Sequence, residues 1–157
     1  MRAPRIRRAT VDDCERLTEL ALRSKAHWGY SKAFIAACRD ELTVRPARLA
    51  HDTYTCFVAE RDGATQGFGA VDQLPCGTWE LDALFVEPAS IGTGVGRALL
   101  AHATALVREA GGTELRIHGD PHAERFYLAA GATLIGYSES GSIPGRMLPT
   151  YTLALAR

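Results

Sequence analysis

Hydrophobic positions recur at two different spacings along the chain, and the spacing separates expected helices from expected strands. Apolar residues three and four apart, typical of a helix with one buried face, follow a start signal at Thr10 and Asp13. The same spacing recurs over residues 31–42 and, most persistently, over residues 95–110, where Gly111 and Gly112 supply a stop. A shorter stretch, residues 123–130, ends at Gly131. The pattern predicts about four helices.

Alternation of apolar and polar residues predicts strands elsewhere. Residues 54–60 and 65–71 flank Asp62 and Gly63, a pair that strongly favours a tight hairpin. Residues 79–86 follow at once, so the three segments are expected to form an antiparallel meander. The remaining strands are expected over residues 6–9, 115–118, 133–139 and 148–155.

The order of these elements indicates a mixed sheet. A strand over residues 79–86, a helix, and a strand over residues 115–118 imply a right-handed crossover with parallel pairing. The other expected pairings are antiparallel, so the fold class is α+β with one parallel step. With 157 residues, the chain has the size of one domain, which we expect to span residues 1–157.

Composition and charge exclude several classes of protein. Hydrophobic residues make up 46% and charged residues 23% of the chain, ordinary values for a globular domain. The 18 basic and 18 acidic side chains cancel, which argues against nucleic acid or a membrane surface as partner. No leader-like segment or apolar run long enough for a membrane span is found. Cysteines without close pairing indicate reduced thiols, a cytoplasmic protein and no metal site, namely Cys14, Cys38, Cys56 and Cys76.

A glycine-rich loop, IGTGVGRALL, joins the third meander strand to the long helix. Gly92, Gly94 and Gly96 stand on alternate positions immediately before the helix. The N-terminus of a helix has unpaired N–H groups and partial positive charge, and glycines let a phosphate come close. We interpret the loop as a phosphate-binding loop; the alternative is a tight turn and nothing more.

Spacing distinguishes this loop from two other phosphate-binding motifs. A P-loop requires Lys-Ser or Lys-Thr after its last glycine, and none follows here. A dinucleotide fingerprint requires a third glycine at position 97, which is Arg97, and it should follow the first strand of a βαβ unit. Glu114 lies about 20 residues downstream, as that fingerprint demands, but it opens a strand. An NAD-dependent oxidoreductase is therefore disfavoured.

The stretch from Leu84 to Ala132, LFVEPASIGTGVGRALLAHATALVREAGGTELRIHGDPHAERFYLAAGA, resembles the acyl-CoA-binding core of the GNAT superfamily of N-acyltransferases. That resemblance implies a mostly antiparallel sheet of six to seven strands with a central splay, flanked by about four helices. The first position of the family's loop pattern, usually Gln or Arg, is Ile91 here. The residues implied to bind acetyl-CoA are Leu84, Phe85, Val86, Ile91, Gly92, Thr93, Gly94, Val95, Gly96, Arg97, His122 and Phe126.

The resemblance also suggests an acid and a base. Tyr127 matches a tyrosine whose hydroxyl protonates the departing thiolate, which suits a phenol at neutral pH. Glu80 stands where relatives with a strand carboxylate carry the base, with Asp82 as second choice and a bound water as a third possibility. Alternation along the strand would put both carboxylates on one face with Leu84 and Val86. Both could equally be solvated surface residues.

The acceptor side is less well defined by the sequence. By resemblance, the loop between the first two helices caps this side, and its Trp28 and Tyr30 could line an acceptor pocket or belong to the core. Ser142, Pro144 and Arg146 are candidates for the same mouth or for a dimer contact. His118 alternates with apolar strand residues and is interpreted as a histidine satisfied within the sheet.

The resemblance implies an enzyme that transfers an acetyl group from acetyl-CoA to a primary amine of a small molecule or amino-acid-like acceptor. Transfer would be direct, within a ternary complex. The alternative is a GNAT-like domain that binds acyl-CoA without turning it over. A homodimer is possible if the last strand, YTLALA, pairs across an interface; the alternative is that this strand ends its own sheet.

Overall fold

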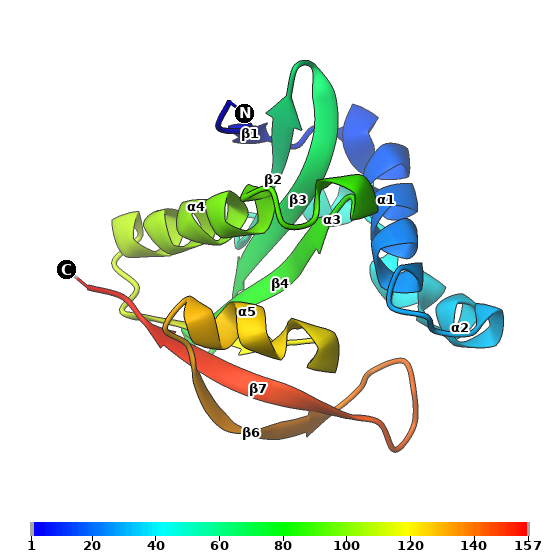
Figure 1. The fold of residues 1–157 in the computed structure, drawn as a ribbon. Coiled ribbons are helices and arrows are strands. Elements are labelled where there is room, and N and C mark those ends of the chain that lie inside the picture. The colour runs from blue at the N-terminus through cyan, green and yellow to red at the C-terminus, as the bar shows by residue number, and fades with distance from the viewer. Residues whose placement is uncertain (1, 157) are drawn as a thin grey trace.

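The computed structural model describes residues 2–156 and contains one seven-stranded sheet (Figure 1). The strands lie in the order β1-β2-β3-β4-β5-β7-β6. Their bounds are β1 Arg5–Arg8, β2 Tyr54–Arg61, β3 Ala64–Gln73, β4 Trp79–Val86, β5 Glu114–His118, β6 Thr133–Glu139 and β7 Met147–Ala154. The helices are α1 Cys14–Ala26, α2 Lys32–Leu42, α3 Pro46–Leu49, α4 Val95–Glu109 and α5 Glu124–Ala129.

Strand pairing confirms the meander, the parallel step and the splay. β2, β3 and β4 pair antiparallel in sequence, and β4 pairs parallel with β5. That parallel pairing is short, because it joins only residues 79–81 of β4 to residues 115–117 of β5. Residues 82–86 of β4 have no ladder partner on β5, so the two strands diverge and the sheet opens at its centre.

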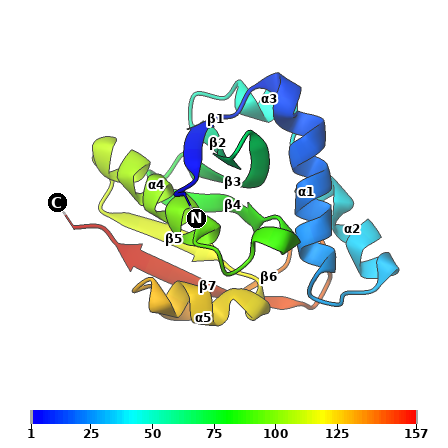
Figure 2. The ribbon, with the colours of Figure 1, turned by 45° about the horizontal axis from the view of Figure 1, so that its top comes forward.

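Helices cover both faces of the sheet (Figure 2). On one face α4 and α5 pack over a core that includes Leu99, Ile117 and Tyr151. On the other face α1 contributes Leu17 and Leu20, which pack against β2 and β3. Each such fully buried aliphatic side chain contributes roughly 1.5–3 kcal/mol of transfer free energy. The two cores hold the separated ends of β4 and β5 between them.

The turns form where the sequence supplies the necessary residues. Asp62 and Gly63 adopt positive φ angles of 54° and 78°, the combination that a two-residue hairpin turn requires. Ser31 caps α2 by accepting a hydrogen bond from the Phe34 N–H at 3.1 Å. Gly111, with φ 89°, follows α4 and ends it.

Two expectations about strands are wrong. The register of β4 against β3 shifts between Ala70 and Val71, so Asp82 is an extra residue in β4. Leu84 and Val86 therefore pack on the α4 side with Leu81, while Ala83 and Phe85 pack on the α1 side. Glu80 and Asp82 consequently do not share a face with Leu84 and Val86.

The last strand is also not placed as expected. β7 lies between β5 and β6 and pairs with both, so it neither offers a free edge to a second copy nor ends the sheet. The two edge strands of the sheet are β1 and β6. In addition, Pro46 begins a short helix, α3, that hydrophobic spacing did not predict, because four residues are too few to show a period.

A buried carboxylate fixes the start of the first helix. The Asp13 side chain accepts hydrogen bonds from Arg7 Nη1 at 2.9 Å, from Arg7 Nη2 at 2.8 Å and from the Thr10 N–H at 2.8 Å. The hydrogen bonds from Arg7 lower the pKa of Asp13 from 3.8 to about 2. This depressed pKa stabilises the fold above about pH 4, and the contribution is lost as the pH falls towards 2.

We expect Asp13→Asn to lower the free energy of unfolding by about 1–3 kcal/mol at neutral pH, because it breaks charged hydrogen bonds in a buried position. The deficit relative to the parent protein should shrink between about pH 4 and pH 2, as Asp13 of the parent becomes protonated. Urea unfolding across this pH range measures it. Asp12→Asn, one residue away and exposed, is the control. A deficit independent of pH would contradict the assignment.

Candidate active site

A cleft of about 780 Å³ opens where β4 and β5 diverge. Its walls are formed by the end of α1 and the residues after it, by the segment from the end of α2 to α3, by β4, by the glycine loop before α4, by the start of α5 and by the segment that leads into β7. It therefore gathers segments from both ends of the chain around the splay.

The glycine loop forms one end of this cleft. Gly92 and Gly94 line it and have φ angles of 81° and 91°, which side chains with a Cβ rarely adopt. An added Cβ at either position would meet no atom within 4 Å, so there is open space in front of the loop. The first N–H groups of α4 point out of the helix end here. The loop thus combines access, unpaired donors and a helix dipole suited to an anion.

The side chains of Thr93 and Val95 stabilise the glycine loop. The Thr93 hydroxyl donates to the Ser90 carbonyl at 2.5 Å, and the Arg61 guanidinium donates to Thr93 Oγ1 at 3.1 Å and to its carbonyl at 3.2 Å. The Val95 side chain is buried in the core. Neither side chain lines the cleft, whereas Ile91 and Arg97 do.

Gly96 lies beside Phe126. A Cβ there would lie 3.4 Å from the Phe126 ring, an ordinary van der Waals contact. Phe126 lines the cleft and also packs against the core.

Tyr127 lies in the wall of the cleft and is only 6% exposed. Its ring packs beside Tyr151 at a centroid distance of 5.5 Å and over Gly119, where a Cβ would come within 3.0 Å of the ring. Burial raises the pKa of the Tyr127 phenol well above its usual value. The hydroxyl is therefore protonated throughout the neutral range, the state a proton donor requires.

Leu84, Phe85 and Val86 line the cleft along the part of β4 that β5 does not pair. Their backbone groups on that edge lack ladder partners among residues 2–156. An extended ligand placed there could use them as a neighbouring strand would.

The two candidate carboxylates have different surroundings. Asp82 lines the cleft and lies 3.3 Å from Arg48 Nη2 and 3.2 Å from the Tyr54 hydroxyl. Burial raises the pKa of Asp82, and the Arg48 charge opposes that rise. Glu80 does not line the cleft; its Oε1 lies 3.4 Å from Nε2 of His118, which does. His118 therefore contacts Glu80 and also borders the cleft.

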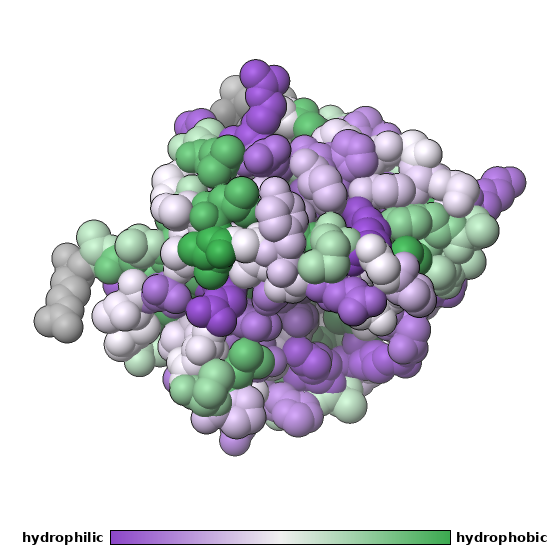
Figure 3. Space-filling model, turned by 90° about the horizontal axis from the view of Figure 1, so that it is seen from below, coloured by the Kyte–Doolittle hydropathy of each residue, from purple (hydrophilic) through white to green (hydrophobic). Residues whose placement is uncertain are grey.

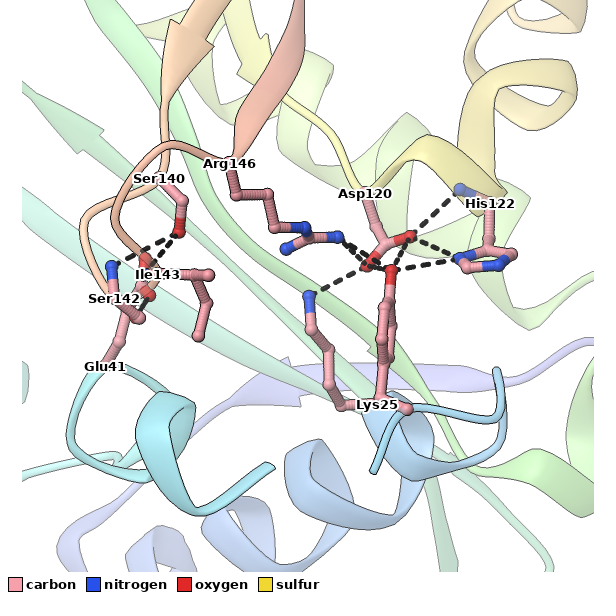
Figure 4. A network of polar contacts seen from close by, with 9 residues as sticks. Lys25, Glu41, Asp120, His122, Ser140, Ser142, Ile143 and Arg146 are labelled. Carbon is pink, nitrogen blue, oxygen red and sulfur yellow. Dashed lines mark hydrogen bonds and ion pairs between the residues drawn. The ribbon is translucent and has the colours of Figure 1, made fainter. Parts of the chain in front are cut away.

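Beyond Tyr127, Asp120 is the centre of a polar network (Figure 4). Its carboxylate accepts hydrogen bonds from Lys25 Nζ at 2.8 Å, from the Tyr30 hydroxyl at 3.0 Å and from the backbone N–H of His122 at 2.9 Å. Arg146 Nη2 lies 3.4 Å away. Burial would raise the pKa of Asp120, but the hydrogen bonds from Lys25 and His122 outweigh it, and the pKa lies below its usual range.

The aromatic residues after α1 belong to this network. Trp28 lines the cleft and stacks on His122, with ring centroids 5.2 Å apart and an interplanar angle of 10°. Tyr30 lies behind, where its hydroxyl contacts Asp120 and accepts from Arg146 Nη2 at 2.7 Å. Burial raises the pKa of Tyr30 to about 12. Trp28 and His122 reach the cleft directly, and Tyr30 supports them.

Sequence reasoning missed several residues of the cleft. His118 carried a signal, since it ends a strand next to the splay, but alternation alone assigned it to the sheet. Lys25 and Asp120 carried none, because they are 95 residues apart and only the fold joins them. Arg48 lies on α3, which the pattern did not predict.

The sequence matches the Acetyltransferase (GNAT) family over residues 15–132. The chain belongs to this family, and it is accordingly an acyltransferase. None of the curated proteins matches the sequence.

Solved structures with the same fold include three proteins of similar length. A GNAT-family protein from Desulfovibrio desulfuricans is 24% identical with a TM-score of 0.76, covering 98% of this chain and 100% of its own. The GCN5-related N-acetyltransferase from Rhodopseudomonas palustris is 21% identical with a TM-score of 0.80, covering 99% and 98%. The PaiA N-acetyltransferase from Thermoplasma acidophilum, solved with coenzyme A, is 19% identical with a TM-score of 0.77, covering 98% and 99%.

Two further observations concern membranes and metals. None of the helices within residues 2–156 has the length and apolar character to cross a lipid bilayer. The same part of the chain contains no cluster of three His, Cys, Asp or Glu side chains arranged to hold a metal ion.

Proposed function

We propose that this acyltransferase moves an acetyl group from acetyl-CoA to a primary amine of a small molecule or amino-acid-like acceptor, directly and within a ternary complex. The observation that carries the proposal is the continuity of the cleft. One cavity extends from the glycine loop, along the unpaired edge of β4 and past Tyr127, to Trp28 and the Asp120 network. A donor and an acceptor bound at its two ends would meet beside Tyr127.

The loop and the strand edge fit acetyl-CoA as donor substrate. The pyrophosphate would lie against the N–H groups at the start of α4, near Gly92, Gly94 and Arg97. The pantetheine arm would pair with the free edge of β4 at residues 84–86. His122 uses its Nδ1 on Asp120 at 2.9 Å, which leaves Nε2 for the donor's amide chain.

The reaction needs one proton removed and one supplied. The amine nitrogen attacks the thioester carbonyl carbon, a C–N bond forms, and the C–S bond breaks. We assign to Tyr127 the proton that the departing sulfur takes up. We assign to Glu80 the removal of the proton from nitrogen, with Asp82 and a bound water as the alternatives; His118 contacts Glu80 and lines the cleft.

A homodimer and a cytoplasmic location complete the proposal. Hydrophobic side chains form separate groups on the face seen from below (Figure 3). Ile135 and Tyr137 of β6 are exposed, and β6 is an edge strand of the sheet whereas β7 is internal, so a second copy would pair at β6. Cys14, Cys38 and Cys56 are buried free thiols, which suit a reducing compartment.

Thermal unfolding with and without ligands tests donor binding. A ligand that binds only the folded state at a hundredfold over its Kd adds about 2.7 kcal/mol, enough to raise Tm by several degrees. We expect such a rise with acetyl-CoA and CoA and none with NAD or ATP. A rise with NAD alone would contradict the proposal.

Two glycine variants show whether the loop is responsible. Gly94 and Gly77 have φ angles of 91° and 93°, and a Cβ at either would meet no atom within 4 Å. Gly94→Ala and Gly77→Ala should therefore impose similar backbone strain, about 1–2 kcal/mol. Only Gly94 faces the cleft, so only Gly94→Ala should reduce the rise in Tm caused by acetyl-CoA. Equal ligand responses would mean that the phosphates bind elsewhere.

A binding domain without turnover makes a different prediction. Acetyl-CoA would stabilise the protein, but thiol release would remain at the uncatalysed rate across a broad panel of amines. Tyr127 in the cleft wall favours the enzyme, because a domain that only binds has no use for a proton donor there.

A further inference from the structure

The Asp120 network contains more positive than negative charge. Lys25 and Arg146 both contact the single carboxylate of Asp120, at 2.8 and 3.4 Å. All three side chains are largely withdrawn from solvent, with 14%, 17% and 17% of their surfaces exposed. One positive charge is thus left over in a position where water compensates it poorly.

The other acidic residues of the cleft have partners of their own. Asp82 lies beside Arg48 and Tyr54, Asp40 pairs with Arg45 at 2.5 Å, and Glu41 accepts a hydrogen bond from Ser142. The Glu41 and Ser142 contact lies apart from the Asp120 network (Figure 4). Among the described residues, Asp120 is the one acidic side chain within ion-pair distance of Lys25 and Arg146.

Arg146 also has N–H groups that these contacts do not use. Its bonds to Tyr30 and Asp120 both use Nη2. Its guanidinium is held over the rings of Tyr30 and Phe34, at 5.2 and 4.9 Å from their centroids. Lys25 donates one of its three N–H groups to Asp120. A rigid, partly buried guanidinium with free N–H groups is a typical binding group for a carboxylate.

We propose that Arg146 and Lys25 form a carboxylate-binding site, and that the acceptor is an amine that also bears a carboxylate, as an amino acid does. This inference rests on the proposed function for the transfer step. A single negative charge balances the single excess positive charge, which favours a carboxylate over a phosphate. The cleft joins this site to Tyr127, so an acceptor held by its carboxylate would have its amine directed towards the splay.

Matched pairs of acceptors test the site. Each standard α-amino acid is compared with its primary amide, which keeps the shape but loses the negative charge. We expect kcat/KM for the best amino acid to exceed that for its amide by roughly 10- to 100-fold, the effect of a charged hydrogen bond. Arg146→Gln should abolish this preference by raising KM for the amino acid far more than KM for its amide.

Two further variants control for misfolding and for charge in general. Lys25→Gln removes the other cation and should weaken the same preference, so the test does not depend on one variant. Arg39→Gln makes the same change as Arg146→Gln at an exposed position of α2 outside the cleft, and should have no effect. Thermal unfolding of each variant confirms folding.

A binding measurement separates this inference from the proposed function. Calorimetric titration of the CoA complex with the amino acids, their amides and the N-acetylated amino acids needs no turnover. Suppose that the carboxylates bind, that Arg146→Gln abolishes this binding, and that no acetyl transfer is detected. This result would support the carboxylate site and refute the transferase. The site is refuted if no carboxylate binds, if Arg146→Gln lowers the affinity for amino acids and for their amides equally, or if that variant weakens the binding of acetyl-CoA instead.

Discussion

Tyr127→Phe is expected to lower kcat by about 10²–10⁴-fold, the usual effect of removing a general acid. The change deletes one oxygen and leaves the ring packed between Tyr151 and Gly119. Folding and donor affinity should therefore be preserved. Without the hydroxyl, the sulfur must leave as an unprotonated thiolate or wait for a proton from water. Initial rates of thiol release at saturating acetyl-CoA measure kcat, and a separate titration measures the Kd of acetyl-CoA.

Tyr151→Phe is a control from the same cluster. Tyr151 is fully buried, and its hydroxyl has no hydrogen-bond partner within the described chain. It does not line the cleft. Removing its hydroxyl should leave kcat unchanged. If Tyr127→Phe retains the parent kcat, or if both variants lose activity alike, Tyr127 does not supply the proton.

Glu80→Gln is expected to lower kcat/KM by about 10²-fold or more near neutral pH. It should also flatten the low-pH limb of the rate profile, because that limb reports loss of a proton from the catalytic base. The substitution keeps the size of the side chain and its place beside His118. The measurement is kcat/KM for the amine across the pH range in which the protein stays folded.

Two comparisons identify the base. Asp82→Asn should retain the low-pH limb if Glu80 is the base and lose it if Asp82 is. His118→Gln should reduce the rate in parallel with Glu80→Gln if protons pass through His118, since His118 contacts Glu80 and lines the cleft. Profiles of Glu80→Gln and the parent that coincide would remove Glu80 from the mechanism and favour Asp82 or a bound water.

The sequence was sufficient wherever local chemistry decides the structure. Asp62 and Gly63 demand the left-handed turn that they adopt, and the glycines at 92 and 94 adopt the angles that only glycine tolerates easily. The long apolar stripe of α4 required a sheet to cover it. These features depend on residues close together in the chain. The meander, the crossover and the glycine loop at one end of the cleft could therefore be predicted.

Features set by distant partners could not be predicted in this way. The bulge at Asp82 reverses the faces of β4 after that residue, and it depends on the register with β3. Polar and apolar residues alternate regularly around Asp82, so the sequence gives no sign of the bulge. The contacts of Asp120 with Lys25 and Arg146 join three separate segments across the cleft. Charge balance within such a cluster becomes visible only when the fold has brought its members together.

Acetyl transfer to an amine is tested by a single reaction that is followed in two ways. The protein is incubated with acetyl-CoA and a panel of amines that includes amino acids, and free thiol and acetylated amine are quantified together, the latter by mass spectrometry. We expect both products to form in equal amounts with at least one amine, and Tyr127→Phe to suppress both. Intact acetyl-CoA in every mixture, despite saturated binding, would contradict this expectation.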